Sequence, residues 1–337
     1  MNKRCLFLAA PIALAFGLGG VGPGMGPSPA MAEEIRFSHA QGEVALPADP
    51  QRIAVFDLPT LDAIHALGKA DLVVAVPKSA DAPPNFPDHL AVYGEDRFAP
   101  AGTVFEPDPA ALTALAPDLI IIGGRSRNAY EAMTAIAPTI DMTAAGDDLA
   151  ENVIAATASL GNLLGAEEAA AERIAAFEAR LADARALGAD AGTGLVLFGA
   201  GQGFSVQAPG GRFGTVYGLV GIEPAIGPSE AATGPRPEPG SPEAEAARKR
   251  QQEALEAALA ADPDWIFTLD RNAAVGNTDA APLIERLAED SRVTATTAWQ
   301  SGQVVELDAR TWYLLHGGID AISASVETIA AAFAAAP

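Results

Sequence analysis

The sequence predicts an α/β protein built as two α/β lobes joined by one long helix. Short runs of β-branched and other apolar residues alternate with helical stretches of roughly ten residues, a pattern typical of a mostly parallel sheet. Between two regions of this kind, residues 147–188 contain no strand candidate. With 337 residues, of which 49% are hydrophobic, the chain is long enough to bury a core in each lobe.

The first 32 residues have the features of a secretory signal peptide. A basic start precedes an apolar run at 6–20, and the small residues Ala30 and Ala32 predict cleavage before Glu33. The apolar run is shorter than the roughly 20 residues that a membrane span needs. Cys5, the single cysteine, lies near the start of this leader and not at the cleavage site. We therefore expect an exported, periplasmic protein without a thiol, a disulfide or a lipid anchor.

The first lobe is expected to cover residues 33–145. Apolar runs predict its strands, and amphipathic stretches between them predict its helices. The expected strands are 52–56, 72–77, 118–124 and 139–142, and the expected helices are 58–68, 109–117 and 128–138.

A helical connection is expected at 146–190. Its first helix ends near Gly165. In the second, Ile174, Phe177, Leu181 and Ala184 are spaced by three and four residues, which puts one apolar stripe beneath a charged face. At about 1.5 Å per residue, this helix of roughly 20 residues would span on the order of 30 Å. That length suits a rigid connection between lobes.

The alternation of strands and helices resumes in a second lobe at 191–337. Its expected strands are 194–201, 264–271 and 303–308, and its expected helices are 215–221, 282–290 and 319–335. An insertion at about 231–260 interrupts the pattern. It is rich in Pro and Gly up to Pro242 and strongly helical afterwards, so we expect a loop followed by a helix.

Three arginines occupy comparable places in an acidic chain that has 21 basic and 43 acidic residues. This balance makes nucleic acid a poor partner. Arg125 and Arg271 each follow a predicted strand, and Arg212 lies in a glycine turn before a helix. Ligands of open α/β sheets bind beyond the carboxyl ends of strands, so these guanidiniums predict a local site for a delocalised oxyanion. The alternative is that each arginine pairs with a nearby carboxylate. Arg127 has no counterpart among these three arginines and is interpreted as a surface residue at a helix start.

Seven fragments together resemble one known family. In chain order they are QRIAVFDLPTLDAIHALG, AVPKS, FEPDPAAL, APDLIIIGGR, PGGRFG, PDWIFTLDRNAAVG and LDARTWYL. They are similar to iron-siderophore substrate-binding proteins of ABC importers, in particular the catecholate-binding branch. The resemblance covers residues 35–335 except the insertion. It implies the class III periplasmic binding protein fold, with a ligand cleft between the lobes and no enzymatic activity.

The resemblance also implies a ligand and partners. The ligand would be a ferric siderophore, trianionic when three catecholates hold the iron, with no permanently bound cofactor. Arg125, Arg212 and Arg271 match the three arginines that line the family's pocket. The partners would be an ABC permease with its ATPase, and we expect a monomer. Glu223 matches a glutamate that docks to the permease, whereas alanine occupies the corresponding place in the first lobe.

Protein ligation of the iron is left open. Tyr313 matches a tyrosine that completes the iron shell in members that bind tetradentate ligands, and a phenolate oxygen suits Fe(III). The family's histidine has no match, because the corresponding stretch, 230–235, reads EAATGP. His316, three residues after Tyr313, is the remaining candidate, whereas His65 is interpreted as structural. Either the siderophore fills all six iron positions, or the insertion supplies other contacts, for example from Arg248.

Other functions fit the sequence less well. The chain has no G-x-S-x-G, no H-E-x-x-H and no complete G-x-G-x-x-G at its Gly-rich stretch 199–204, which speaks against a periplasmic enzyme. Four scattered histidines speak against a zinc-binding protein. Haem, held by Tyr313 and with its propionates on arginines, is the nearer alternative.

Overall fold

A computed structural model describes residues 34–79, 85–228, 238 and 240–336. The expected signal peptide at 1–32, with Cys5, lies outside the described residues. So do the stretch 230–235, where the family's histidine would stand, and most of the Pro-rich part of the insertion. Within the described ranges, no helix combines the length and apolarity that crossing a bilayer requires.

The first lobe contains a five-stranded parallel sheet in the order β5-β4-β3-β6-β7. Its strands are β3 (Ile53–Val55), β4 (Val73–Val76), β5 (Ala99–Pro100), β6 (Leu119–Ile122) and β7 (Thr139–Asp141). Its helices are α1 (Leu58–Ala66), α2 (Pro109–Leu115) and α3 (Tyr130–Thr134). Strands β3 and β6 are buried along their whole length, as expected of the centre of a sheet covered on both faces. The four predicted strands are confirmed.

An N-terminal hairpin precedes this sheet and was not predicted. It pairs β1 (Glu34–His39) with β2 (Gly42–Pro47) in antiparallel register. The alternation of Ile35 with Phe37 and of Val44 with Leu46 around a Gln-Gly turn was a detectable signal for it. The hairpin brings His39 next to Asp141 at the end of β7. The backbone N–H of Asp141 donates to His39 Nδ1 at 3.3 Å.

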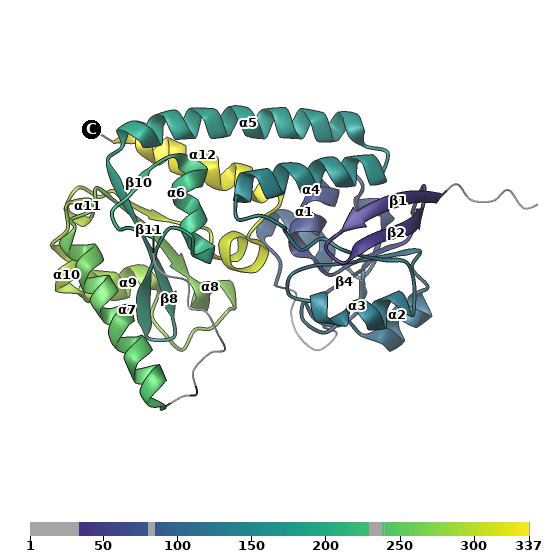
Figure 1. Ribbon diagram of the computed structural model, residues 1–337, viewed down its shortest axis with the longest axis horizontal. Coiled ribbons are helices and arrows are strands. Elements are labelled where there is room, and N and C mark those ends of the chain that lie inside the picture. Colours follow the sequence, from purple (N-terminus) through teal and green to yellow (C-terminus); the bar gives the residue numbers. More distant parts are fainter. Residues whose placement is uncertain (1–33, 80–84, 229–237, 239, 337) are drawn as a thin grey trace, which may run out of the picture. The chain divides into compact units, whose positions relative to one another are not determined.

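Two helices join the lobes, as predicted. They are α4 (Leu149–Leu163) and α5 (Glu167–Asp190). Along α5, Ala170 packs in the core of the first lobe, whereas Phe177, Leu181 and Ala184 pack in that of the second. The predicted apolar stripe is therefore confirmed, and one helix contributes to both cores. Figure 1 shows α5 running beside α4 and α12.

The second lobe is built on a sheet in the order β10-β8-β11-β12, with β9 paired antiparallel to β8. Its strands are β8 (Thr193–Ala200), β9 (Gly203–Gln207), β10 (Glu223–Pro224), β11 (Trp265–Asp270) and β12 (Val304–Glu306). Its helices are α6 (Thr215–Val220), α7 (Pro242–Ala260), α8 (Arg271–Ala274), α9 (Leu283–Glu289), α10 (Ser291–Thr294), α11 (Thr297–Gln300) and α12 (Ile319–Ala335). The helix expected in the insertion is α7.

The described residues from Glu34 onward form one compact unit that holds both five-stranded sheets. The boundaries expected at 145 and 190 stay a prediction.

One buried carboxylate helps to join the two lobes. Asp62 of α1 is fully buried and accepts the N–H groups of Asp320 and Ala321, at 3.0 and 3.1 Å. It thereby satisfies first-turn N–H groups of α12, which lack partners within their own helix. His89 Nε2 lies 2.7 Å from the same carboxylate.

We expect Asp62→Ala to lower the free energy of unfolding by about 3 kcal/mol, because it removes a buried charged acceptor from two backbone N–H groups and His89. Urea denaturation followed by circular dichroism measures the change. Asp88→Ala is the matched control. The Asp88 side chain is fully exposed in its ion pair with Arg310, so its loss should leave the midpoint nearly unchanged. Equal effects of the two variants would contradict the role given to Asp62.

Candidate ligand-binding site

A π-helical turn at Thr311–Leu315 carries Tyr313 between β12 and α12. The N–H of His316 donates to the carbonyl of Thr311, five residues earlier, at 2.7 Å. His316 then ends the turn in the left-handed conformation, with φ 51°. Single π turns occur often at functional sites, and the last carbonyls of a helix lack intrahelical donors. The carbonyl of Tyr313 is thus available to side chains.

Three arginines converge on Tyr313. Arg125 and Arg212 donate to its carbonyl oxygen at 2.6 and 2.8 Å, and Arg271 Nε donates to its hydroxyl oxygen at 2.8 Å. Their guanidinium carbons lie 5.4, 5.5 and 5.4 Å from the centre of the Tyr313 ring. The structure therefore brings together all four residues that the sequence singled out as ligand-binding, although their binding role itself stays a prediction.

The strands place these arginines as predicted. Arg125 follows β6 after two glycines, and Arg271 follows β11 directly as the first residue of α8. Asp270, the last residue of β11, accepts the N–H of Asn272 at 2.9 Å and thus fixes the start of α8. Arg212 stands in a short helical turn before α6. Each guanidinium thus comes from a different strand end or turn.

Two phenylalanines that the sequence argument did not single out support the Tyr313 ring. Phe198 of β8 stacks on it with ring centres 6.1 Å apart, and Phe213 lies 6.4 Å away. The two phenylalanine rings stack on each other at 5.0 Å. Offset and tilted aromatic pairs of this kind hold ring orientation. The position of the phenol is consequently set by packing as well as by Arg271.

The three cations have no carboxylate partner within ion-pair distance among the described residues. The alternative that each arginine pairs with a nearby carboxylate is therefore wrong for this part of the chain. Partial burial and the neighbouring Arg125 cation lower the pKa of Arg212 from its ordinary value. Since an arginine stays protonated even so, the site is a concentration of positive charge.

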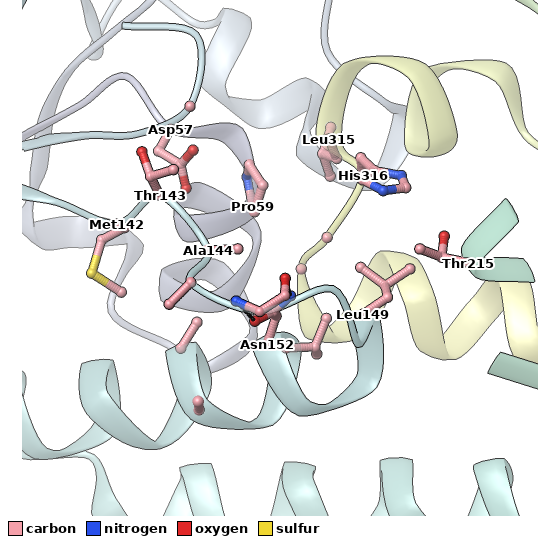
Figure 2. Close-up of a pocket in the computed structure, with 18 of the residues that line it drawn as sticks. Asp57, Pro59, Met142, Thr143, Ala144, Leu149, Asn152, Thr215, Leu315 and His316 are labelled. Carbon is pink, nitrogen blue, oxygen red and sulfur yellow. Dashed lines mark hydrogen bonds between the residues drawn. The ribbon is translucent and has the colours of Figure 1, made fainter. Parts of the chain in front are cut away.

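A cavity of about 1190 Å³ adjoins Arg125 and Arg212. Residues of both lobes line it, among them Arg125, Arg212 and His316, whereas Tyr313 and Arg271 do not. Figure 2 shows Asp57, Met142 and Thr143 on one side of this cavity and His316 and Thr215 on the other. Arg125 and Arg212 thus line the cavity and also donate to the main-chain carbonyl of Tyr313.

His316 is held as a neutral imidazole. Burial lowers its pKa to about 4, and the nearby cations Arg212 and Arg125 add to the lowering. Its ring lies between those of Phe213 and Trp312, at 5.7 and 6.1 Å. Its Nδ1 atom is buried and has no hydrogen-bond partner among the residues that the structure describes. Across the described residues, no group of three or more His, Cys, Asp or Glu side chains is arranged to hold a metal ion.

Asp57 is a further residue of the cavity wall that was not predicted, although it lies only two residues beyond the end of strand β3. It accepts the backbone N–H and the hydroxyl of Thr60 at 3.1 and 2.7 Å, which caps α1. Burial raises the pKa of Asp57 to about 6, and the charge of Asp141 adds to this rise. A Cβ atom at Gly123 would lie 2.2 Å from Asp57 Oδ1, so glycine is needed there on the approach to Arg125.

The remaining sequence candidates lie away from these arginines or on the surface. Glu223 is exposed at the start of β10, and Arg127 is exposed as predicted. His65 packs against Tyr93 at 5.7 Å between ring centres, which fits its structural interpretation.

Comparison with known proteins identifies the chain. The model of a family described as periplasmic binding protein matches residues 53–311. The chain therefore belongs to the periplasmic binding protein family, and it is a binding protein, not an enzyme. A TroA-like member from Xylanimonas cellulosilytica is 31% identical, with a TM-score of 0.75 over 90% of this chain and 99% of that one. This likeness confirms the predicted class III fold with two lobes.

Two further relatives are named for their ligands. The petrobactin-binding protein YclQ of Bacillus subtilis is 26% identical over 88% of this chain and 87% of its own length. Its crystal structure matches with a TM-score of 0.73. The periplasmic catecholate-siderophore binding protein VctP of Vibrio cholerae is 27% identical over 89% of this chain and 100% of that one, also with a TM-score of 0.73.

We expect Asp57→Asn to remove part of the pH dependence of stability. A folded-state pKa of about 6, above the ordinary 3.8, means that the contribution of Asp57 is fully present below pH 3.8 and is lost as the pH rises through 6. Asparagine keeps the cap without the charge, so the variant should gain on the order of 2 kcal/mol at pH 7 relative to wild type. Urea midpoints at pH 4.5 and 7 measure this. The exposed Asp96→Asn is the control, and identical pH slopes in both variants would refute the argument.

Proposed function

We propose that this periplasmic binding protein captures a ferric siderophore, of the anionic catecholate kind, and delivers it to an ABC importer for iron uptake. The observation that carries the proposal is the convergence of Arg125, Arg212 and Arg271 on Tyr313 without carboxylate partners within the described chain. The names of the relatives that bind petrobactin and catecholate siderophores support it.

The chemistry of the arginines fits such a ligand. A guanidinium donates parallel hydrogen bonds to delocalised oxyanions and also stacks on planar rings. A ferric complex of three catecholates carries three negative charges, which equals the charge of the three arginines. Bound between the lobes, the complex would replace the repulsion among these cations by attraction. We therefore assign ligand binding to Arg125, Arg212, Arg271 and Tyr313.

The siderophore supplies most or all of the iron ligands in this proposal. Tyr313 is the candidate protein ligand, because its phenol oxygen lies in the arginine cluster and is a hard donor suited to Fe(III). His316 is neutral at physiological pH, but it lines the cavity, whereas Tyr313 does not. A shared coordination by both residues is therefore the less favoured arrangement.

Partners and location follow from the same proposal. The chain would leave the cytoplasm through the signal peptide at 1–32, remain unlipidated in the periplasm and act as a monomer. Its second lobe would dock to the ABC permease through the exposed Glu223, and the ATPase of that importer would drive release and transport.

Titration of ligands against tryptophan fluorescence tests the function. The mature protein contains Trp265, Trp299 and Trp312, and Trp312 is fully buried next to Tyr313. We expect quenching at the lowest concentrations with a ferric tris-catecholate, and weaker binding of a neutral ferric hydroxamate and of haemin. Tight binding of the neutral hydroxamate without preference for the anionic complex would contradict the role of the arginines.

Each of Arg125→Gln, Arg212→Gln and Arg271→Gln is expected to weaken binding of the ferric tris-catecholate about 10- to 100-fold, because each removes a charged hydrogen-bond donor. Arg127→Gln is the matched control, since it removes the same charge from an exposed position two residues beyond Arg125. Isothermal titration calorimetry measures the four affinities. An equal loss in the control would mean that overall charge, and not the site, attracts the ligand.

Tyr313→Phe separates ligation of iron from recognition of charge. With a tetradentate ferric bis-catecholate, we expect wild type to show a tyrosinate-to-iron absorption band that the variant lacks, because two iron positions remain open to the protein. With a hexadentate tris-catecholate the two visible spectra should be alike. The same spectra for both proteins with the tetradentate ligand would show that Tyr313 does not bind iron.

A further inference from the structure

Phe105 is the most exposed of the large hydrophobic residues that the structure describes, at 57%. It lies on the turn between β5 and α2 of the first lobe. A single exposed apolar side chain is ordinary on a protein surface. What distinguishes Phe105 is its place, because its ring lies beside the guanidinium of Arg125.

The turn holds Phe105 in a fixed position. Thr103 Oγ1 accepts the N–H groups of both Phe105 and Glu106, at 3.2 and 3.0 Å, and the N–H of Thr103 donates to the carbonyl of Glu106 at 2.9 Å. At Gly102, where φ is +104°, a Cβ atom would lie 2.4 Å from that same carbonyl oxygen. The backbone of this turn is thus closely packed and hydrogen-bonded, and it presents the phenyl ring to solvent.

Arg125 stands between two aromatic rings. Its guanidinium carbon is 5.3 Å from the centre of the Phe105 ring and 5.4 Å from that of Tyr313. Distances below about 6 Å are those of cation–π contacts. The Phe105 ring therefore borders the arginine cluster from the first lobe, as Tyr313 does from the second, and it leaves most of its own surface free.

We propose that Phe105 is a specificity residue that stacks on a planar aryl group of the bound chelate. This rests on the proposed function and adds to it a residue that recognises the aromatic face of the ligand and so favours aryl-bearing iron chelates over aliphatic ones. The oxygens of a catecholate would pair with Arg125 while its ring covers Phe105. Burial of the exposed phenyl surface stabilises only a complex whose ligand has an apolar face to offer. An aliphatic carboxylate chelate satisfies the arginines but gains nothing from Phe105.

Two anionic probes test the proposal, a ferric tris-catecholate and ferric citrate, which lacks a ring. We expect Phe105→Leu to weaken the catecholate complex roughly tenfold, the size of a lost aromatic contact, and to change citrate binding less than about twofold. Phe105→Tyr should restore the wild-type affinity for the catecholate, because it restores the ring. Leu187→Ala, which truncates an exposed apolar side chain of α5, is the control and should change neither affinity.

The outcomes are distinct. An equal loss for both probes, or no loss for the catecholate, overturns the stacking role. It does so even when the arginine variants lose binding, which is the result that the proposed function expects. Unchanged affinities together with impaired iron uptake in cells would make Phe105 a docking residue for the importer and would also overturn it. If wild type binds neither probe, the proposed function and this inference both fall. Unfolding midpoints of the variants, expected to equal that of wild type, show that folding is not the cause.

Discussion

The electrostatic repulsion among three guanidiniums around Tyr313 is the constraint on which the arrangement of the site depends. Each guanidinium carbon lies within 5.5 Å of one ring centre, so any two lie within twice that distance of each other. Like charges 10 Å apart repel by about 1 to 2 kcal/mol at an effective dielectric constant near 20. The carbonyl and hydroxyl of Tyr313 offset part of this cost as acceptors. The rest is available to favour an anionic ligand.

The π turn makes this arrangement possible, and its anchors lie on both sides of it. The N–H of Thr311 donates to Asp308 Oδ1 at 2.7 Å, and Trp312 is fully buried in the core of the second lobe. Arg125 comes from the other lobe, so its bond to the carbonyl of Tyr313 is a contact between lobes. A second such contact joins Asn85 Nδ2 to the carbonyl of Ala274 at 2.9 Å. A ligand that competes for Arg125 therefore acts on the junction of the lobes, whereas α5 and the Asp62 contact to α12 keep them joined.

The sequence was sufficient for the two-lobed fold, the connecting helix and the positions of Arg125 and Arg271 beyond strand ends, because these depend on periodicity and on where strands end. Phe177, Leu181 and Ala184 show their helical spacing directly. The π turn at Tyr313 leaves no such signal, since one extra residue per turn follows from tertiary packing. The same holds for the burial that keeps His316 neutral. Asp57 was overlooked although it lies shortly beyond the end of β3, as Arg125 lies shortly beyond the end of β6, because only cations were sought at strand ends.

The formal charge of −22 opposes the approach of an anionic ligand, yet it need not weaken binding. At physiological ionic strength the Debye length is about 8 Å, so carboxylates on distant surfaces are largely screened from a ligand at the site. The arginines act at hydrogen-bond distance, which is shorter than the screening length, so salt weakens their contacts little. Selectivity thus resides in the few residues around Tyr313, and the acidic exterior affects the rate of encounter more than the stability of the complex. Raising the salt concentration screens that long-range repulsion before it weakens the short contacts. In a site that relies on long-range attraction, added salt would instead screen the attraction first.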